Sequence, residues 1–379
     1  MSNTAPAVDP DGLLEYSVVF TDRSLNHMSK KFQNVMRDIS STMGQVYKAD
    51  EVVVVPGGGT AGMEAVARQF ATDKNVMIIR NGWFSFRWSQ ILDAGDIAKE
   101  AYVMKAARTG DYHQAPFAPP AIEDVVAEIK SRKPDVVFAP HVETSSGIML
   151  PDGYFKEVAD AVHEVGGLFV LDCIASGAIW VDMSATGVDV LISAPQKGWS
   201  SSPSSGLIMM SKAAVDALSE TTSSSFALDL AKWRQIMQAY LGGGHAYHST
   251  MPTDALTGFR DTLMETKDYG FEKLRSEQEA LGKRTREVLA QKGYASVAAR
   301  GFEAPGVVVS YTDNPAIQNG SAFAAHGMQV AAGVPLQCDE PDDYSTFRLG
   351  LFGLDKLDNV NRTVERLVNV LDAIEKENQ

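Results

Sequence analysis

A single lysine, Lys197, lies in the polar stretch SAPQKGWSSSPSSG between two apolar segments, residues 188–193 and 205–210, that resemble buried strands. A lysine in such a turn is often an ordinary surface residue. If it lies in a crevice instead, the loss of solvation lowers its pKa and makes the amine nucleophilic. Such an amine can form an imine with a carbonyl carbon, so Lys197 is a candidate catalytic residue.

Two other features have residue types that complement a reactive amine. Asp172 ends the apolar segment GLFVLD, and open parallel sheets place ligand-binding groups at such strand ends, although an aspartate there also commonly caps a turn. The segment GGGT at 57–60 lies between a strand-like run and a helix-like run. Its amides could approach an anion. A plain tight turn or a dinucleotide loop is also compatible, although GxGxxG is absent.

Pyridoxal phosphate (PLP) is a cofactor that needs all three features. Its aldehyde takes a lysine as a Schiff base, its ring nitrogen needs a carboxylate, and its phosphate needs a glycine-rich helix start. Asp172, Lys197 and the segment Gly58, Gly59, Thr60 supply these groups. The sequence therefore predicts a PLP site.

Short apolar strands alternate with helical segments along the first two thirds of the chain. This alternation predicts an α/β fold with a mainly parallel sheet, in which the two strands beside Lys197 are antiparallel neighbours. A long charged helical run begins near Thr253, and a smaller strand-and-helix segment follows it. We expect an N-terminal segment (1–27), a large cofactor-binding domain (28–255) and a small C-terminal domain (256–379).

Composition limits the function further. The net charge of -14 and pI of about 5.0 disfavour nucleic-acid binding. The two cysteines, Cys173 and Cys338, cannot form a disulfide framework, and no Cys/His spacing indicates a metal site. The sequence shows neither a signal peptide nor an apolar run long enough for a bilayer. We expect a cytoplasmic protein with no metal and no membrane or nucleic-acid partner.

Seven motifs, in order along the chain, give the sequence a resemblance to a known family. It resembles the class V, fold-type I PLP-dependent aminotransferases, most closely the alanine–glyoxylate and serine–glyoxylate (or serine–pyruvate) group. The motifs are GGGTAGMEA (57–65), NGWFSFR (81–87), HVETSSG (141–147), DCIAS (172–176), SAPQKG (193–198), YHST (247–250) and FRLGLFG (347–353). The resemblance implies a seven-stranded, mainly parallel sheet in the large domain and a smaller α+β C-terminal domain.

The resemblance also implies the roles of individual residues. The phosphate would bind at Gly59 and Thr60, and the ring nitrogen would pair with Asp172. Phe84 would stack on the ring, although the adjacent Trp83 leaves that register uncertain by one residue. The other implied contacts with the cofactor come from Thr144, Ile174, Gln196 and, across a dimer interface, Tyr247 and Thr250. Arg348 would hold the α-carboxylate of the substrate, because a guanidinium binds a carboxylate in a bidentate manner.

The implied reaction is a ping-pong transamination in a homodimer. Alanine or serine would be the amino donor, and glyoxylate or pyruvate the acceptor. The N-terminal stretch departs from the family, with Phe20, Thr21 and Arg23 where Pro and Gly are usual, so substrate choice stays open. Trp199 and the serines that follow it could reshape the entrance to the site.

Two alternatives remain open. A class V lyase such as a cysteine desulfurase would use Cys338 as its thiol, but desulfurases usually have histidine at the position of Gln196. The acidic residues around Cys338 also oppose thiolate formation. A non-catalytic nucleotide-binding α/β protein would use the segment VVVVPGGGT, but it leaves Asp172, Lys197 and Arg348 unexplained.

Overall fold

The computed structural model describes residues 13–377, so the first twelve residues of the expected N-terminal segment lie outside the described residues. Seven strands form one sheet in the order β1-β9-β8-β7-β6-β2-β3. Their bounds are β1 Glu51–Pro56, β2 Asn75–Arg80, β3 Glu100–Lys105, β6 Val136–Pro140, β7 Leu168–Asp172, β8 Val190–Ser193 and β9 Ser205–Met210. The strands from β8 to β3 pair in parallel, and β9 is antiparallel to both of its neighbours. The mainly parallel sheet and the antiparallel strands beside Lys197 are confirmed.

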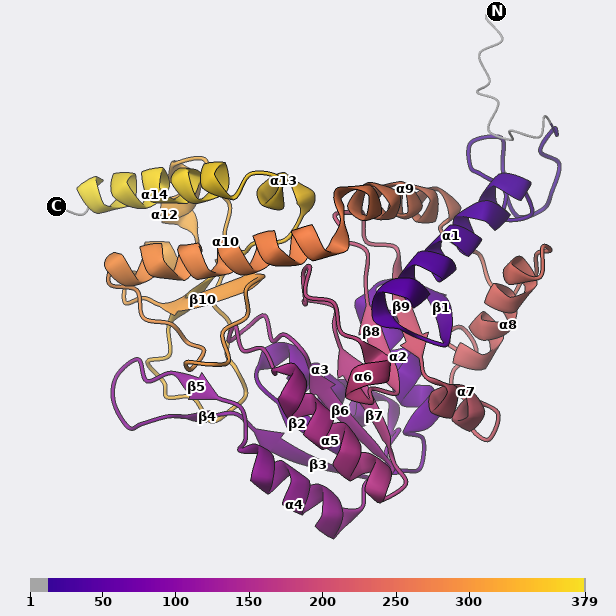
Figure 1. Cartoon of the computed structure of the whole chain (residues 1–379), viewed down its shortest axis with the longest axis horizontal. Helices are drawn as coiled ribbons and strands as arrows, with labels where there is room; N and C mark the ends of the chain where they lie inside the picture. Colours follow the sequence, from indigo (N-terminus) through magenta and orange to yellow (C-terminus); the bar gives the residue numbers. More distant parts are fainter. Residues whose placement is uncertain (1–12, 378–379) are drawn as a thin grey trace, which may run out of the picture.

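Apolar, largely β-branched residues explain why these segments form buried strands. The four valines of β1 and all of β6 and β8 are buried, because helices cover both faces of the sheet. Figure 1 shows these helices around the sheet. They are α1 Lys30–Tyr47, α2 Gly59–Phe70, α3 Trp83–Gly95, α4 Ile122–Arg132, α5 Asp152–Glu164, α6 Met183–Thr186, α7 Lys212–Leu218 and α8 Leu230–Leu241. This arrangement brings the C-terminal ends of the parallel strands to one edge.

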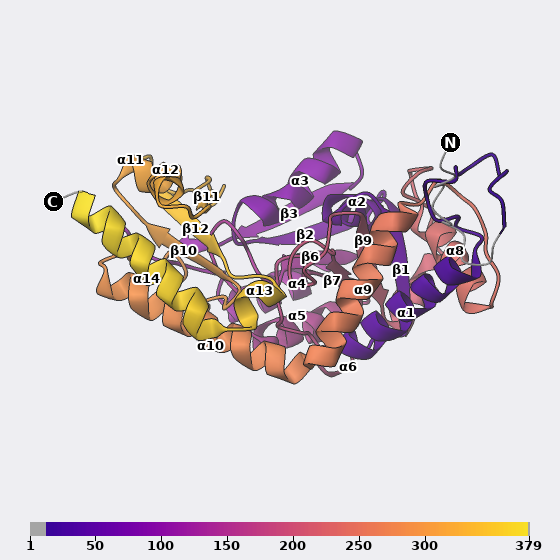
Figure 2. The same ribbon diagram turned by 90° about the horizontal axis from the view of Figure 1, so that it is seen from above.

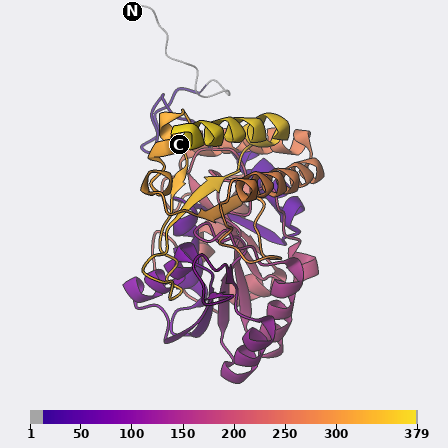
Figure 3. The same ribbon diagram turned by 90° about the vertical axis from the view of Figure 1, so that its left-hand side faces the viewer.

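A second, smaller sheet, in the order β10-β12-β11, belongs to the C-terminal part of the chain. Its antiparallel strands are β10 Val307–Tyr311, β11 Ala331–Ala332 and β12 Thr346–Gly350. Figures 2 and 3 show α10 and α14 lying along this part of the molecule. The remaining helices are α9 Thr253–Tyr269, α10 Phe271–Gln291, α11 Pro315–Gln318, α12 Ser321–Ala325, α13 Leu354–Leu357 and α14 Val360–Glu377. Two short strands, β4 Ala107–Arg108 and β5 Phe117–Ala118, pair antiparallel with each other.

The long charged run expected after Thr253 is two helices. Gly270 separates α9 from α10 with a φ of 101°, a conformation that favours glycine. On one side, Arg260 of α9 pairs with Asp38 of α1, at 2.8 Å. On the other, Lys292 pairs with Asp372 and Glu375 of α14. The helix pair therefore connects the two parts of the molecule, and the residue bounds of the three expected segments stay a prediction.

No helix within residues 13–377 is both long and apolar enough to cross a membrane. The cytoplasmic location stays a prediction.

Candidate active site

Lys197 lies in the turn between β8 and β9, and close backbone packing fixes that turn. A Cβ atom at Gly198 would lie 2.4 Å from the carbonyl oxygen of Gly177, so only glycine fits there. The indole of Trp199 is buried and donates a hydrogen bond to Ser193 Oγ, at 3.2 Å. The Trp199 ring packs inward, 4.6 Å from the ring of Trp180, so it does not itself line an entrance, and the expected effect of the loop on the entrance stays a prediction.

The Lys197 side chain is half-buried, and its amine forms no ion pair with a carboxylate of the described residues. Burial lowers its pKa, and the positive charges of Arg348 and Arg87 lower it further. The Nζ atom lies 5.8 Å from the centre of the Phe352 ring. The amine is therefore available in its neutral, nucleophilic form more readily than that of a surface lysine.

Asp172 is the last residue of β7 and is only 8% exposed. Its Oδ1 atom accepts one hydrogen bond, from the amide of Ile174 at 2.9 Å. Burial, the largest cause, and nearby Glu143 raise its pKa to about 7, although the Ile174 amide and Arg87 act in the opposite direction. A cation bound against this carboxyl group would stabilise its negative charge, because the single hydrogen bond from Ile174 offsets little of the cost of burying that charge.

The glycine turn joins β1 to α2. Gly58 caps α2 without a side-chain hydrogen bond, so the first amides of the helix lack a side-chain acceptor. A Cβ atom at Gly59 would lie 2.5 Å from the side chain of Ile174, so this turn packs directly against the segment that follows Asp172. Thr60 is exposed at the same helix start. The turn therefore offers unpaired amides to an anion beside the buried carboxyl group.

Phe84 and Arg348 meet although they belong to different parts of the chain. Arg348, on β12, lies with its guanidinium 5.7 Å from the centre of the Phe84 ring. Its Nε donates to the carbonyl of Ala332 at 2.8 Å, and its Nη1 to the carbonyl of Thr144 at 3.5 Å. Trp83 contacts Phe86 instead, at 5.8 Å. Phe84, not Trp83, therefore contacts Arg348.

Two polar residues of the HVETSSG motif are buried and form hydrogen bonds within the protein. Glu143 is fully buried and accepts hydrogen bonds from the amides of Phe84 and Ser85, which start α3. His141 contacts Ser176 Oγ at 2.7 Å, and burial lowers its pKa to about 3, so its ring is neutral. Glu143 therefore orients the segment that contains Phe84.

Three predicted residues lie elsewhere in the single chain or are chemically unsuited. Tyr247 is 55% exposed and its hydroxyl contacts Thr250 Oγ1, at 3.2 Å, with no recorded contact to Lys197 or Asp172. Cys338 is 4% exposed, and burial raises the pKa of its thiol to about 12. A thiol of this kind is a poor nucleophile at neutral pH.

Arg87 is the residue near the site that sequence reasoning missed. Its Nη1 donates to Thr60 Oγ1 at 3.1 Å, and its guanidinium lies 5.2 Å from the Phe84 ring centre. The available signal was its position three residues after Phe84, which places both on the same face of a helix.

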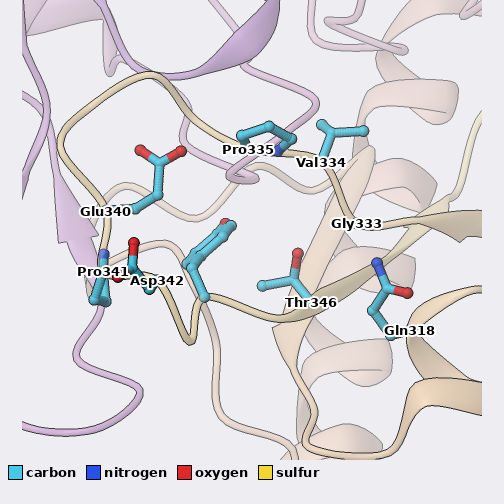
Figure 4. A pocket seen from close by; sticks show the side chains of 9 residues that line it. Gln318, Gly333, Val334, Pro335, Glu340, Pro341, Asp342 and Thr346 are labelled. Atoms are coloured by element: carbon cyan, nitrogen blue, oxygen red, sulfur yellow. The ribbon is translucent and has the colours of Figure 1, made fainter.

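A cavity of about 300 Å³ lies next to β12 and is shown in Figure 4. Thr346, on the strand of Arg348, and Gly333 belong to its lining. Glu340, at its other side, accepts amide hydrogen bonds from Leu336 and Cys338 and so folds the loop there. None of the lining residues is a predicted site residue, so this cavity is separate from the Lys197 group.

The described residues fit PLP. The side-chain oxygen of Gln196, next to the lysine, is buried without a hydrogen-bond partner, and the Asp172 carboxyl group is buried with one. The glycine turn packs against Ile174 with free amides. Fold and site thus define a PLP-dependent enzyme of fold type I.

Comparison with known proteins specifies the family. Residues 11–333 match the Aminotransferase class-V family, and the chain belongs to it. It is 28% identical over 333 residues to the 2-aminoethylphosphonate–pyruvate transaminase of Burkholderia ambifaria, covering 86% of this chain and 83% of that protein. It is 27% identical over 254 residues to the alanine–glyoxylate aminotransferase of Callithrix jacchus, covering 65% of this chain and 58% of that one.

Solved structures show the same fold. The ureidoglycine–glyoxylate aminotransferase of Bacillus subtilis superposes with a TM-score of 0.77 at 19% identity, covering 91% of this chain and 85% of that chain. The pyridoxamine–pyruvate aminotransferase of Mesorhizobium loti gives a TM-score of 0.78 at 15% identity, with 93% and 86% covered. The protein is therefore a PLP-dependent class V aminotransferase acting on amino and oxo acids.

Proposed function

We propose that this enzyme transfers an amino group from a small amino acid, alanine or serine, to glyoxylate or pyruvate by a ping-pong mechanism. The observation that supports this proposal most is the half-buried amine of Lys197, which has no carboxylate partner among the described residues. Burial and the charges of Arg348 and Arg87 lower the pKa of this amine. An amine in this setting can both bond to a carbonyl carbon and accept a proton.

Each residue around Lys197 then has a task. PLP, when bound, supplies the electron sink that makes the α-proton of the donor removable. Lys197 would hold the cofactor through its amine, and the same amine would move the α-proton of the donor. Asp172 stabilises the positive charge of the ring nitrogen. Phe84 and Ile174 would position the ring, and Thr144 and Gln196 would bind its polar substituents. The phosphate would bind at Gly58, Gly59 and Thr60.

Arg348 binds the substrate's carboxylate in this proposal. Its Nη atoms keep most of their donors free, because Ala332 accepts from Nε and Thr144 accepts from Nη1 alone. A planar guanidinium matches both oxygens of a carboxylate. Arg348→Lys should therefore raise KM for donor and acceptor alike, and titration of initial rates against both substrates measures this.

A second copy of the chain completes the site in this proposal. All exposed large apolar side chains of the described residues except Tyr112 lie in two segments, 13–28 and 226–247. These side chains are Leu13, Leu14, Tyr16, Val18, Met28, Phe226, Leu241 and Tyr247. An apolar surface of this kind favours association. Tyr247 and Thr250 would then reach the partner's cofactor phosphate.

The first experiment tests Lys197. Borohydride reduction of the loaded enzyme should fix the cofactor on the peptide that contains Lys197, as mass spectrometry of a digest would show. Lys197→Ala should lose turnover, whereas Lys212→Ala, at a lysine exposed on α7, should keep it. An adduct on another lysine would contradict the assignment.

The second experiment identifies the donor. A panel of amino donors is added to the loaded enzyme while cofactor absorbance is followed, and glyoxylate or pyruvate is then used to restore the starting spectrum. A second candidate donor is 2-aminoethylphosphonate, because a relative named for it matches 86% of this chain. Its phosphonate would bind Arg348 in place of a carboxylate. Conversion by alanine or serine alone supports the first proposal.

The third experiment tests the shared site. Lys197→Ala and Tyr247→Ala chains are each expected to be inactive. Mixed dimers would have one site with both changes and one with neither, so mixing should restore part of the activity. Proven chain exchange without any recovery would argue that each site is complete within one chain.

A further inference from the structure

We propose that Arg87 binds the phosphate group of the cofactor. This inference deepens the proposed function, because it rests on the phosphate role of the turn at Gly58, Gly59 and Thr60.

Arg87 is tied to the start of α2. It comes from the second turn of α3, yet its Nη1 donates to Thr60 Oγ1, the second residue of α2, at 3.1 Å. Its guanidinium also lies 5.2 Å from the ring centre of Phe84, one turn earlier on its own helix. Two contacts from two elements therefore hold the charge beside the free amides of the glycine turn.

The Arg87 guanidinium lacks an anionic partner in the described part of the chain. No carboxylate there lies within ion-pair distance, and Thr60 is its one recorded hydrogen-bond acceptor. A guanidinium has five donors in a fixed fork, so most of them remain available. A half-buried cation with unused donors favours an anion that the protein itself does not supply.

Phosphate fits this position better than a substrate carboxylate. A helix start and a guanidinium together suit a doubly charged, multi-oxygen anion. Arg348 lies on β12 instead, and its hydrogen bonds go to the carbonyls of Ala332 and Thr144 and not to Thr60. The two arginines that contact the Phe84 ring therefore bind different anions. Arg87 binds the phosphate of the cofactor, and Arg348 binds the carboxylate of the substrate.

The experiment compares PLP with pyridoxal, which lacks the phosphate. Binding of each to the apoenzyme is measured by absorbance titration for the wild type, Arg87→Gln and Arg87→Lys. Arg87→Gln should weaken PLP binding by about ten- to a hundredfold and leave pyridoxal binding unchanged. Arg87→Lys should recover part of the loss, because an ammonium keeps the charge without the fork.

A matched control is Arg68→Gln, an arginine of α2 that pairs with Glu64. It should change neither affinity. Equal losses for PLP and pyridoxal in Arg87→Gln would assign Arg87 a structural role and overturn the proposal. Unchanged PLP affinity with a raised KM for the donor would assign it to the substrate, and would also overturn it. If the wild type itself bound PLP and pyridoxal equally, the proposed phosphate role of the glycine turn would fail as well.

Discussion

Two buried carboxyl groups, Glu143 and Asp172, lie near the ends of neighbouring strands but differ in the number of hydrogen bonds that they accept. Pro140, at the end of β6, pairs with Asp172, at the end of β7, and Glu143 follows three residues later. Glu143 accepts five hydrogen bonds, two from Ser85, two from Ser145 and one from Phe84. Asp172 accepts one, from Ile174.

This difference separates a structural carboxylate from a functional one. Glu143 accepts as many hydrogen bonds as its oxygens can hold, and these bonds fix the start of α3 and the loop at Ser145. Asp172 could accept further hydrogen bonds, and its single bond does not offset the free-energy cost of burying its charge. A buried acid with few donors is therefore the better candidate for contact with a bound cation.

The largest expected effect comes from Asp172→Asn. Loss of the negative charge beside the ring nitrogen should lower kcat/KM by at least about a hundredfold. The apoprotein should respond in the opposite way. Burial raises the pKa of Asp172 to about 7, so ionisation between about pH 4 and pH 7 costs the folded apoprotein stability. The asparagine variant should therefore be more stable at pH 8, by up to about 4 kcal/mol.

Urea unfolding of both apoproteins at pH 5 and pH 8 checks this prediction. The gap between wild type and variant should widen from the lower pH to the higher one. A gap that is the same at both values would show that Asp172 is ionised without cost in the apoprotein, and that its surroundings resemble those of Glu143.

The next effect in size is that of Glu143→Gln. An amide presents donors to the amides and hydroxyls that Glu143 now satisfies, so the free energy of unfolding should fall by about 3 kcal/mol. Chemical denaturation measures the loss. Asp160→Asn, at a surface carboxylate that pairs with Lys156, is the control and should change stability by less than about 1 kcal/mol. A stable Glu143→Gln protein with poor turnover would instead make Glu143 catalytic.

The smallest effect is expected for Cys338→Ser. The thiol is protonated at neutral pH, because burial and the charge of Glu143 raise its pKa to about 12. Transamination should therefore change by less than about threefold, and neither protein should release sulfide from cysteine. Sulfide release by the wild type that disappears in the variant would favour a desulfurase and reverse the order of these effects.

The sequence could predict those candidate site residues that lie at or just after the ends of strands. Asp172 ends one apolar strand and Lys197 follows the next, and parallel strands bring such ends to one edge, so the sequence could place both residues at that edge of the sheet. The glycine turn was predictable because strand, glycines and helix follow one another directly. The family resemblance supplied Phe84 and Arg348, which composition and spacing alone could not connect.

Other features depend on contacts that no local pattern encodes. The edge strand β3 has mostly exposed or half-exposed residues, so it lacks the apolar signal of its neighbours. The contact between Arg87 and Thr60 joins two helices through their side chains. The role proposed for Tyr247 requires a second copy of the chain. Each of these requires tertiary or quaternary structure, which propensity and periodicity do not report.

The adjacent indoles of Trp180 and Trp199 also give the enzyme an internal fluorescent reporter. They lie 4.6 Å apart, and Trp199 follows the lysine by two residues. Pyridine aldehydes absorb light in the range where indoles emit, so excitation would pass from this pair to a cofactor at Lys197. Quenching of the intrinsic fluorescence should therefore follow loading of the site in real time, without any added dye.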